Sequence, residues 1–446
     1  MKNPLKNFEK NGVKFVRIIW CDNANIIRAK SIHINYLKNT LDDGVKIAKA
    51  QMAIPVMYDA VVPSTGLSPV GEVTLIPDLN TLKILPFAKG QASMIGDMKN
   101  LGNLEAWEQC PREYLKRQIK RLGERGLNLK AVFENEFYLL KKDEKGNVLK
   151  TDNSVFAMTS FANENADFLL DLEDTLERQG LKVESYYSES GPGQQEFNIR
   201  YSDALTCADN QITYRETVKG VASQHQYIAS FMPKIFEESG GSGTHLNFSL
   251  WKNAVNISGD KKSENGISEE ASKFVAGILH HLKALCAVTI PSVNSYRRII
   301  PHYWAGAYVS WGCYNREASI RISKNSAQTK AQRFELKVSD ASANPYLALG
   351  ALIACGLDGI EKHMKLFEET TVDPGYVPKE ECKERGIERL PKDLGEALDY
   401  LEKDSVILNS MGEGLARSFF EVRKFEWENL KDATLEQEVE IMLEKY

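Results

Sequence analysis

Three features that would point to a membrane, nucleic-acid-binding or secreted protein are missing from this sequence of 446 residues. No apolar run approaches the roughly 18 residues of a membrane-spanning helix, and the N-terminal stretch MKNPLKNFEKNG has no apolar core of a signal peptide. No basic block stands out and the net charge is −5, which argues against nucleic acid as the main partner. We therefore expect a soluble, cytoplasmic protein with neither a membrane nor a nucleic-acid partner.

Cysteine is also scarce, and its spacing is uninformative. The seven cysteines form an odd, scattered set without a CxxC pair. Such a set favours reduced thiols in a cytosolic protein over a disulfide framework or a zinc site.

The length exceeds that of one ordinary domain, and the secondary-structure pattern changes along the chain. Residues 1–106 are expected to form a β-rich domain, in which the turn residues Asp22–Asn25 join two strands of a hairpin. Residues 107–446 are expected to form a large catalytic domain whose strands lie between amphipathic helices, so the predicted class is α+β. The helices are predicted at 112–126, 166–180, 208–225, 268–290, 344–364, 393–404 and 412–430.

The stretch Ala131–Leu140, AVFENEFYLL, is the clearest candidate for a functional strand. Side chains alternate between the two faces of a strand, so the two phenylalanines share one face, and Glu134 and Glu136 share the other. Two buried carboxylates about 7 Å apart repel each other, and hard divalent cations with oxygen ligands are the usual way to offset that cost. The alternative is a half-exposed strand whose acidic face is solvated.

Four further segments repeat this alternation of polar and apolar side chains. Their polar faces carry carboxylate, imidazole and guanidinium groups. The segments are SESGPGQQEFNIR (188–200) with Glu189 and Glu196, GGSGTHLNFSLW (240–251) with His245 and Ser249, 294–322 with Arg298, Arg316 and Arg321, and RFELKVS (333–339) with Arg333, Glu335 and Lys337.

If the apolar faces of these strands pack under helices, their polar faces line one wet cavity. Carboxylates in such a cavity bind divalent cations, and guanidinium groups bind a polyanion, which together favour a metal-bound triphosphate and phosphoryl transfer. The absence of a GxxxxGK[ST] motif excludes a P-loop protein. Separate surface strands with solvated faces are the alternative.

Six motifs, in order along the chain, resemble the signatures of the glutamine synthetase family. They are Glu134-Asn135-Glu136, ESGPGQQE (189–196), FMPKIFEESGGSGTH (231–245), NSYRRIIP (294–301), NREASIRI (315–322) and FELKVSDASANPYLAL (334–349). The resemblance covers the chain from about Val13 to the C-terminus. It implies an N-terminal β-grasp domain, a catalytic domain with a curved antiparallel sheet that forms a strand funnel backed by helices, and a ring-shaped homo-oligomer, often a dodecamer, with active sites between subunits.

The resemblance also implies two or three Mg²⁺ or Mn²⁺ ions per site and ATP as co-substrate. Two trios of side chains would hold the metals: Glu136, Glu189 and Glu196 one ion, and Glu134, His245 and Glu335 the ion that bridges the phosphates of ATP. A shift of the alignment by one residue would place Ser188 or Glu184 in competition with Glu189.

The remaining positions are assigned by the same resemblance. Arg316 and Arg321 would bind the nucleotide phosphates and the transferred phosphoryl group, with Ser249 and Arg333 near the nucleotide. Arg298, Gly241 and Lys337 would contact glutamate. In the family, the γ-carboxylate of glutamate attacks the γ-phosphate of ATP, and an amine captures the resulting acyl phosphate.

The sequence departs from the family pattern around both organic substrates. Trp304 replaces a glutamate that helps to deprotonate ammonium, and its indole is a donor only, so it cannot act as a base. Its ring could instead cover an apolar or cationic organic amine. Gly240 and Lys337 replace an asparagine and an arginine, and Lys337 loses the bidentate fork. Asp59 is the nearest counterpart of the family's ammonium-binding aspartate.

These departures favour an ATP-dependent ligase that joins glutamate, or a similar acid, to an organic amine and gives a γ-glutamyl amide. An authentic glutamine synthetase that uses ammonia is the second possibility. A catalytically silent regulator that binds nucleotide is the third, because a fold does not fix a function.

Overall fold

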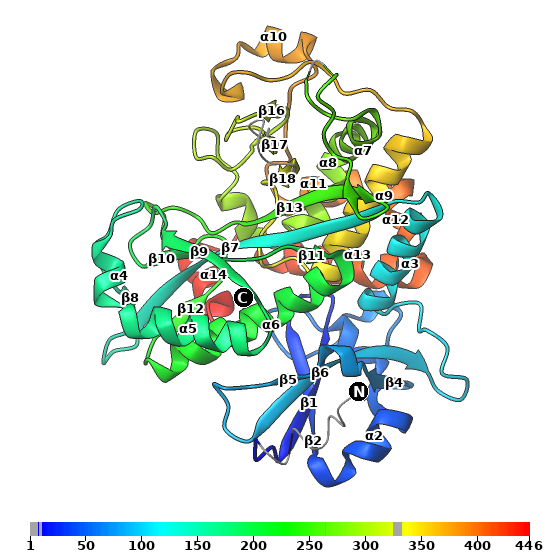
Figure 1. Cartoon of the computed structure of the whole chain (residues 1–446), viewed down its shortest axis with the longest axis vertical. Coiled ribbons are helices and arrows are strands. Elements are labelled where there is room, and N and C mark those ends of the chain that lie inside the picture. Colours follow the sequence, from blue (N-terminus) through cyan, green and yellow to red (C-terminus); the bar gives the residue numbers. More distant parts are fainter. Residues whose placement is uncertain (1–7, 9–10, 264, 324–331) are drawn as a thin grey trace.

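Two β-sheets, one from each part of the chain, organise the described residues 8, 11–263, 265–323 and 332–446 of this computed structural model (Figure 1). The first sheet has the strand order β2-β1-β6-β4-β3, and β5 pairs with β6. Its strands are β1 (Phe15–Cys21), β2 (Ile27–His33), β3 (Val45–Ala48), β4 (Glu72–Pro77), β5 (Lys83–Ile84) and β6 (Gln91–Asn100).

The expected hairpin of β1 and β2 is present. The two strands pair antiparallel from Phe15↔His33 to Cys21↔Ile27, and β1 also pairs parallel with β6. In the turn, Asp22 Oδ1 accepts the Ile26 N–H at 2.9 Å, and Asn25 has a positive φ of 62°, which asparagine tolerates better than most residues.

The second sheet carries the candidate site and has the order β16-β17-β18-β13-β7-β10-β9, with β8, β11 and β12 also on β7 and β14 on β13. Its strands are β7 (Asn128–Lys142), β8 (Val148–Lys150), β9 (Val183–Ser188), β10 (Gln194–Ile199), β11 (Ser202–Asp203), β12 (Ile228–Ser230), β13 (Thr244–Lys252), β14 (Val255–Asn256), β16 (Trp311–Cys313), β17 (Ile320–Ser323) and β18 (Arg333–Leu336). A separate pair joins β15 (Tyr308–Val309) and β19 (Glu388–Arg389). The large sheet is antiparallel as expected, except that β16 and β17 run parallel.

The long helices lie where they were predicted, except in one segment. The 268–290 segment is two helices, because the chain breaks at His281, whose ring is buried between Asp358 and Asp404. Short helices were missed because one or two turns give too few repeats of the apolar pattern. The helices are α2 (Leu37–Asp43), α3 (Pro111–Glu124), α4 (Ser160–Glu164), α5 (Ala166–Arg178), α6 (Ala204–Gln224), α7 (Glu269–His280), α8 (Leu282–Thr289), α9 (Pro345–Glu361), α10 (Lys379–Glu384), α11 (Leu394–Lys403), α12 (Ser405–Met411), α13 (Glu413–Leu430) and α14 (Leu435–Met442).

The apolar faces of the functional strands pack under helices, as the alternation predicted. Leu246 and Phe248 of β13 and Phe334 of β18 are fully or almost fully buried, and the ring of Phe248 lies 6.1 Å from that of Phe274 on α7. Because successive side chains point to opposite faces, the polar residues of the same strands lie on the side away from these helices.

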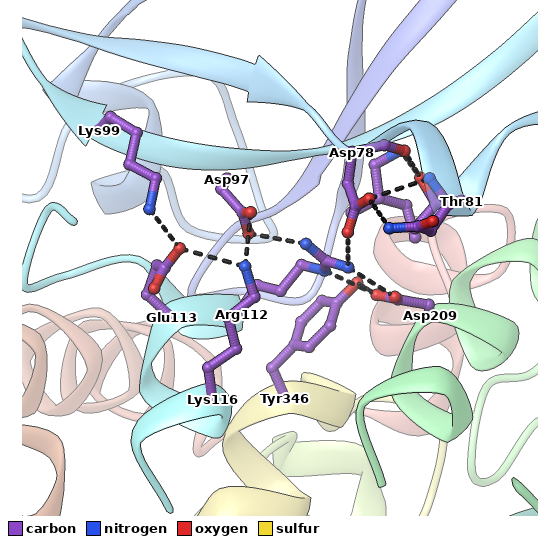
Figure 2. A network of polar contacts seen from close by, with 11 residues as sticks. Asp78, Thr81, Asp97, Lys99, Arg112, Glu113, Lys116, Asp209 and Tyr346 are labelled. Carbon is purple, nitrogen blue, oxygen red and sulfur yellow. Dashed lines mark hydrogen bonds and ion pairs between the residues drawn. The ribbon is translucent and has the colours of Figure 1, made fainter. Parts of the chain in front are cut away.

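A buried ionic joint at the start of α3 connects the first sheet to helices α3, α6 and α9 (Figure 2). The guanidinium of Arg112 donates to Asp209 on α6 at 2.8 and 2.9 Å, to Asp97 on β6 at 2.8 Å and to Asp78 at 2.8 Å. Tyr346 on α9 donates its hydroxyl to Asp209 Oδ1 at 2.8 Å. One cation therefore holds carboxylates from both parts of the chain.

Within the described part of the chain, no helix has both the length and the apolar character needed to cross a bilayer.

Candidate active site

Strand register brings the predicted acidic side chains together. In the β13–β7 pair His245 lies opposite Glu134, and in the β10–β7 pair Glu196 lies opposite Glu136. In the next pairs Glu335 of β18 lies opposite both Asn247 and Arg321. Directly opposed residues have Cβ atoms about 4.5–5.5 Å apart, so these pairings by themselves place the groups within reach of one ion.

The six side chains form two trios with the membership expected from the sequence. One trio is Glu134, His245 and Glu335, and the other is Glu136, Glu189 and Glu196; within each, one ligand atom per residue lies within 4.8 Å of the others. Glu189 therefore lies with the second trio, at the turn that joins β9 to β10.

The chemistry of both trios fits a hard divalent cation. His245 is buried, and its Nδ1 lies 3.2 Å from Glu335 Oε1 without making a hydrogen bond to any described residue. The second trio offers carboxylate oxygens alone, which is the donor set that Mg²⁺ and Mn²⁺ prefer. The residues thus have the identity and proximity to hold metal, and their role as ligands stays a prediction.

The two trios differ in their protonation. Burial and the Lys337 ammonium act to lower the pKa of His245, but Glu134, Glu335 and Glu136 outweigh them and raise it to about 9. Burial and the charge of Glu136 raise the pKa of Glu189 to about 7. Burial and the charges of Glu134 and Glu136 raise the pKa of Glu196 to about 8. At neutral pH and without a bound cation, Glu196 is therefore mostly protonated and Glu189 is partly protonated.

Neighbouring polar groups fix the orientation of the carboxylates. Gly243 N–H and Gln194 Nε2 donate to Glu136 Oε2 at 2.8 and 3.3 Å. Asn198 donates to Glu196 at 2.6 Å and Asn247 to Glu134 at 3.1 Å. The predicted polar strand faces contain Asn198 and Asn247. Gln194 was not singled out, although it lies inside the quoted ESGPGQQE motif.

Glu335 is the most heavily compensated carboxylate of the site. Arg321 Nε donates to its Oε2, and Lys337 Nζ lies 3.3 Å from its Oε1. Burial opposes ionisation, but Lys337, His245 and Arg321 together hold the pKa of Glu335 well below its usual range. Arg321 and Lys337 thus neutralise the charge of Glu335.

A pocket of about 770 Å³, open to solvent, is lined by both trios together with Arg298, Gly241, Lys337 and Arg316. The buried guanidinium of Arg298 donates Nη2 to the backbone oxygens of Lys337 and Ser339 at 3.2 and 3.1 Å, whereas its Nε has no partner among the described residues. This leaves a buried donor at the pocket wall for a carboxylate. A Cβ on Gly241 would lie 2.6 Å from Arg298 Cγ and 2.7 Å from the Pro233 oxygen, so only glycine fits there.

A second pocket of about 890 Å³ lies beside the first, and Glu134 borders both. Ser249 and Arg333 line it, as expected for residues near a nucleotide. Lys130 Nζ lies 4.4 Å from the ring of Trp251, and the ring of Tyr201 lies 6.3 Å from that of Trp251. These rings, which sequence reasoning did not single out, offer an apolar wall for a base.

Aromatic side chains surround the mouth of the first pocket. The ring of Phe156 meets Trp304 edge to face at 6.1 Å and Tyr187 at 5.8 Å, and all three line the pocket. The guanidinium of Arg316 lies 5.8 Å from the ring of Trp304. Trp304 is thus placed at the pocket as predicted, whereas Phe156, on the segment between β8 and α4, was missed because loop geometry alone brings it there.

Asp59 lies away from this pocket. Its side chain is 88 % exposed, and its Oδ1 is 3.7 Å from Arg28 Nη1. Within one chain the structure does not bring Asp59 to the two trios.

Comparison with known proteins matches both parts of the chain to one family. Residues 3–111 match the model "Glutamine synthetase N-terminal domain" and residues 108–442 match "Glutamine synthetase, catalytic domain". Similar curated proteins include type-1 glutamine synthetase 1 of Dictyostelium discoideum (33 % identity, 97 % of this chain and 90 % of the relative) and glutamine synthetase of Halobacterium salinarum (34 %, 99 % and 96 %). Similar solved structures include a GmaS/ADP complex (TM-score 0.85, 28 % identity, 99 % of both chains) and a novel glutamine synthase homolog (0.86, 27 %, 97 % and 99 %).

Fold and family together define an ATP-dependent ligase that forms C–N bonds. The chain belongs to the glutamine synthetase family. The expected fold, an N-terminal domain followed by a catalytic domain of mixed helices and sheet, is confirmed. The family models meet at residues 108–111, and the division between residues 106 and 107 stays a prediction.

Proposed function

We propose that this protein joins the γ-carboxylate of glutamate to an organic primary amine, at the expense of ATP, and releases a γ-glutamyl amide. The observation that carries the proposal is the ring cluster of Phe156, Tyr187 and Trp304 at the pocket mouth. Aromatic faces and edges favour an alkyl or cationic organic group over the small, strongly hydrated ammonium ion. The similarity to a solved GmaS/ADP complex supports the nucleotide-binding part of this assignment.

The two pockets suggest how the substrates are arranged. ATP occupies the pocket of Ser249, Arg333 and Trp251, with its phosphates toward Glu134 at the shared border. The α-carboxylate of glutamate pairs with the buried donor of Arg298, and its amino group lies near the backbone of Gly241. Mg²⁺ or Mn²⁺ held by the two trios supplies charge neutralisation and alignment of the phosphates.

The chemistry has two steps. An oxygen of the γ-carboxylate attacks the γ-phosphorus, the bond to the bridging oxygen breaks, and ADP leaves. The neutral amine nitrogen then attacks the acyl carbon, the bond from that carbon to the phosphate oxygen breaks, and the proton lost by the nitrogen leaves with the inorganic phosphate as the amide forms. Arg316 and Arg321 stabilise negative charge on the transferred group through charge-assisted hydrogen bonds.

Asp59 enters this scheme only through a neighbouring subunit. Its carboxylate pairs with Arg28 but is exposed, so in a ring-shaped homo-oligomer with active sites between subunits it would meet the pocket of a second copy and bind the ammonium form of the amine. We include this assembly, and a cytoplasmic location, in the proposal.

Authentic glutamine synthetase activity is the competing function, because curated relatives at 33 and 34 % identity have that name. A silent nucleotide sensor is disfavoured by the two complete trios of metal-ligating groups, which a sensor does not require.

Phosphate release from Mg-ATP and glutamate, measured with ammonium, methylamine, ethanolamine, putrescine and an aromatic amine, separates these functions. We expect an organic amine to exceed ammonium in kcat/KM by roughly tenfold or more, which corresponds to about 1.4 kcal/mol of differential transition-state binding. Equal turnover with ammonium would contradict the proposal, and no turnover with any amine would favour the sensor.

Trp304→Glu supplies the matched variant. Placing a carboxylate at the pocket mouth is expected to raise kcat/KM for ammonium and lower it for the best organic amine, each by roughly tenfold. Trp427→Phe, which changes a tryptophan remote from the pocket, is the control and is expected to leave the preference unchanged.

A further inference from the structure

The segment that carries Trp304 has an unusual backbone. His302 and Trp304 have φ values of 68° and 56°, in the left-handed region that L side chains seldom adopt. Two such residues within three positions persist only where the surroundings over-determine the conformation. Some other part of the protein must therefore hold the segment.

Glu317 is the group that does so. The residue is only 8 % exposed, and its Oε1 accepts the Trp304 N–H at 2.7 Å. Burial raises the pKa of Glu317, while the backbone N–H groups of Trp304 and His302 lower it. The Trp304 amide thus binds an anion that is a side chain of the same chain, as backbone amides in turns commonly do.

Further hydrogen bonds fix the positions of both Glu317 and the segment that carries Trp304. Glu317 N–H donates to Asn315 Oδ1 at 3.0 Å, and Asn315 Nδ2 donates to the backbone oxygens of Thr370 and Val372 at 2.7 and 2.9 Å. The ring of His302 is paired with Asp373 Oδ2 at 2.7 Å. Glu317 therefore has a fixed position from which to hold the Trp304 segment.

We infer that Glu317 is a positioning residue that sets the height of the Trp304 indole over the amine subsite. Glu317 is not among the described residues that line the pocket, and it acts through the amide of Trp304, which does line it. Its neighbour Arg316 lies 5.8 Å from the same indole, so the segment 315–317 contacts both the ring and the backbone of Trp304. The inference rests on the proposed function, because it assigns a task to Trp304 in amine choice.

Kinetics of Glu317→Ala, Glu317→Gln and Glu369→Ala test this role. Loss of the acceptor is expected to raise KM for the preferred organic amine roughly tenfold, with KM for ATP and glutamate within about twofold of wild type. Glutamine keeps an acceptor oxygen and is expected to restore most of the affinity. Glu369 is a matched control, because its Oε1 also accepts a backbone N–H, that of Cys313 at 2.7 Å, without touching the Trp304 segment.

A double-mutant cycle with Trp304→Ala and hydrogen exchange give two independent readouts. If Glu317 acts through Trp304, its substitution adds little to KM for the amine once the indole is absent. Peptides spanning 300–306 are expected to exchange faster in Glu317→Ala than in wild type, whatever the amine. Should the alanine variant not fold, Glu317→Asp, whose shorter side chain withdraws the carboxylate, replaces it with the same expectation.

The outcomes distinguish the two proposals. If wild type prefers ammonium, the proposed function fails, while faster exchange at 300–306 in Glu317→Ala would still support the structural role of Glu317. Unchanged exchange together with an unchanged KM for the amine in Glu317→Ala would overturn the inference. An equal rise of KM in Glu369→Ala, or full additivity with Trp304→Ala, would overturn it as well.

Discussion

At the scale of single residues, the carboxylates of one pocket experience opposite electrostatic surroundings. Burial acts to raise the pKa values of Glu134 and Glu335, but His245 and nearby cations outweigh it and lower them. For Glu189 and Glu196, burial and like charges outweigh the hydrogen bonds from Ser190 and Asn198, and their pKa values are raised to about 7 and about 8. Glu134 and Glu335 are therefore ionised at neutral pH, whereas Glu196 is mostly protonated and Glu189 is partly protonated.

This difference predicts a pH-dependent affinity for Mn²⁺. A raised carboxyl pKa means that the acid form persists as pH falls below 8 and then 7, so protons compete with the metal on the acid side. The apparent Kd is expected to weaken by about tenfold per pH unit for each proton displaced, between pH 8 and 6. Titration calorimetry in buffers of different ionisation enthalpy measures the released protons.

Glu196→Gln is the control for that titration, because it removes one proton-binding group from the second trio. Its proton release is expected to fall by about one per ion bound. An affinity for Mn²⁺ that is constant from pH 6 to 8.5 in wild type would contradict the account.

Gly241→Ala tests the acid subsite. A methyl group there would lie 2.7 Å from the backbone oxygen of Pro233, which cannot move away as a flexible side chain would. Displacement of the loop from Arg298 is expected to raise KM for glutamate by about ten- to a hundredfold, with ATP affinity retained. Gly123→Ala on α3, where a Cβ meets nothing within 4 Å, is the control for the added methyl group.

At the scale of elements, the break between α7 and α8 contains a buried ion cluster. His281 places its two ring nitrogens 2.6 Å from Asp404 and 3.0 Å from Asp358, so both nitrogens act as donors. Burial would lower the pKa of His281, but the two carboxylates outweigh it and raise the pKa. The imidazolium thus joins α9 to the junction of α11 and α12.

The free energy of unfolding should be larger when His281 is charged than when it is neutral. Because the folded-state pKa is raised, its contribution is fully present below pH 6.5 and is lost as pH rises through the folded-state value. His281→Ala removes the cation that Asp358 and Asp404 share and is expected to cost about 3 kcal/mol at pH 6, and less at pH 9. Urea unfolding at both pH values measures the difference.

The surface pair His225–Asp171 is the matched control. Its atoms are 2.8 Å apart, but Asp171 is 64 % exposed, so His225→Ala should cost less than about 1 kcal/mol. An equal cost of the two substitutions would show that burial of the His281 cluster adds nothing.

The elements also show which parts of the site can be predicted from sequence. The alternation in Phe133–Phe137 and Leu246–Ser249 fixes which side chains face the pocket, and register then brings Glu134 beside His245. Phe156 and Glu317 lie beyond this reasoning, because they reach the Trp304 segment through loop conformation and left-handed residues. No periodic pattern encodes those contacts.

At the scale of the whole molecule, we expect the joint at Arg112 to make the two parts of the chain unfold together. Three carboxylates from both parts of the chain share its guanidinium, and their side chains are 12–21 % exposed (Figure 2). The sequence predicted the helix that begins here but not the joint, because its partners lie 15, 34 and 97 positions away.

Arg112→Ala is expected to lower the free energy of unfolding by about 3–5 kcal/mol, because it removes the cation that Asp78, Asp97 and Asp209 share. Calorimetry should resolve a separate, earlier transition of the N-terminal sheet. Arg125→Ala removes an exposed pair with Glu361 at 2.9 Å and should change stability by less than about 1 kcal/mol. A single unshifted transition in Arg112→Ala would contradict the role of the joint.

Phe156 and Trp304 lie on connecting segments, whereas the strands carry most of the two metal-ligating trios. Under the proposed function, substitutions confined to residues 152–158 and 300–305 are expected to change which amine is used and to leave the use of ATP intact. Related enzymes are therefore expected to acquire different amine substrates through substitutions in these two loops alone. A laboratory library of variants in the same two segments should yield a similar range of amine preferences.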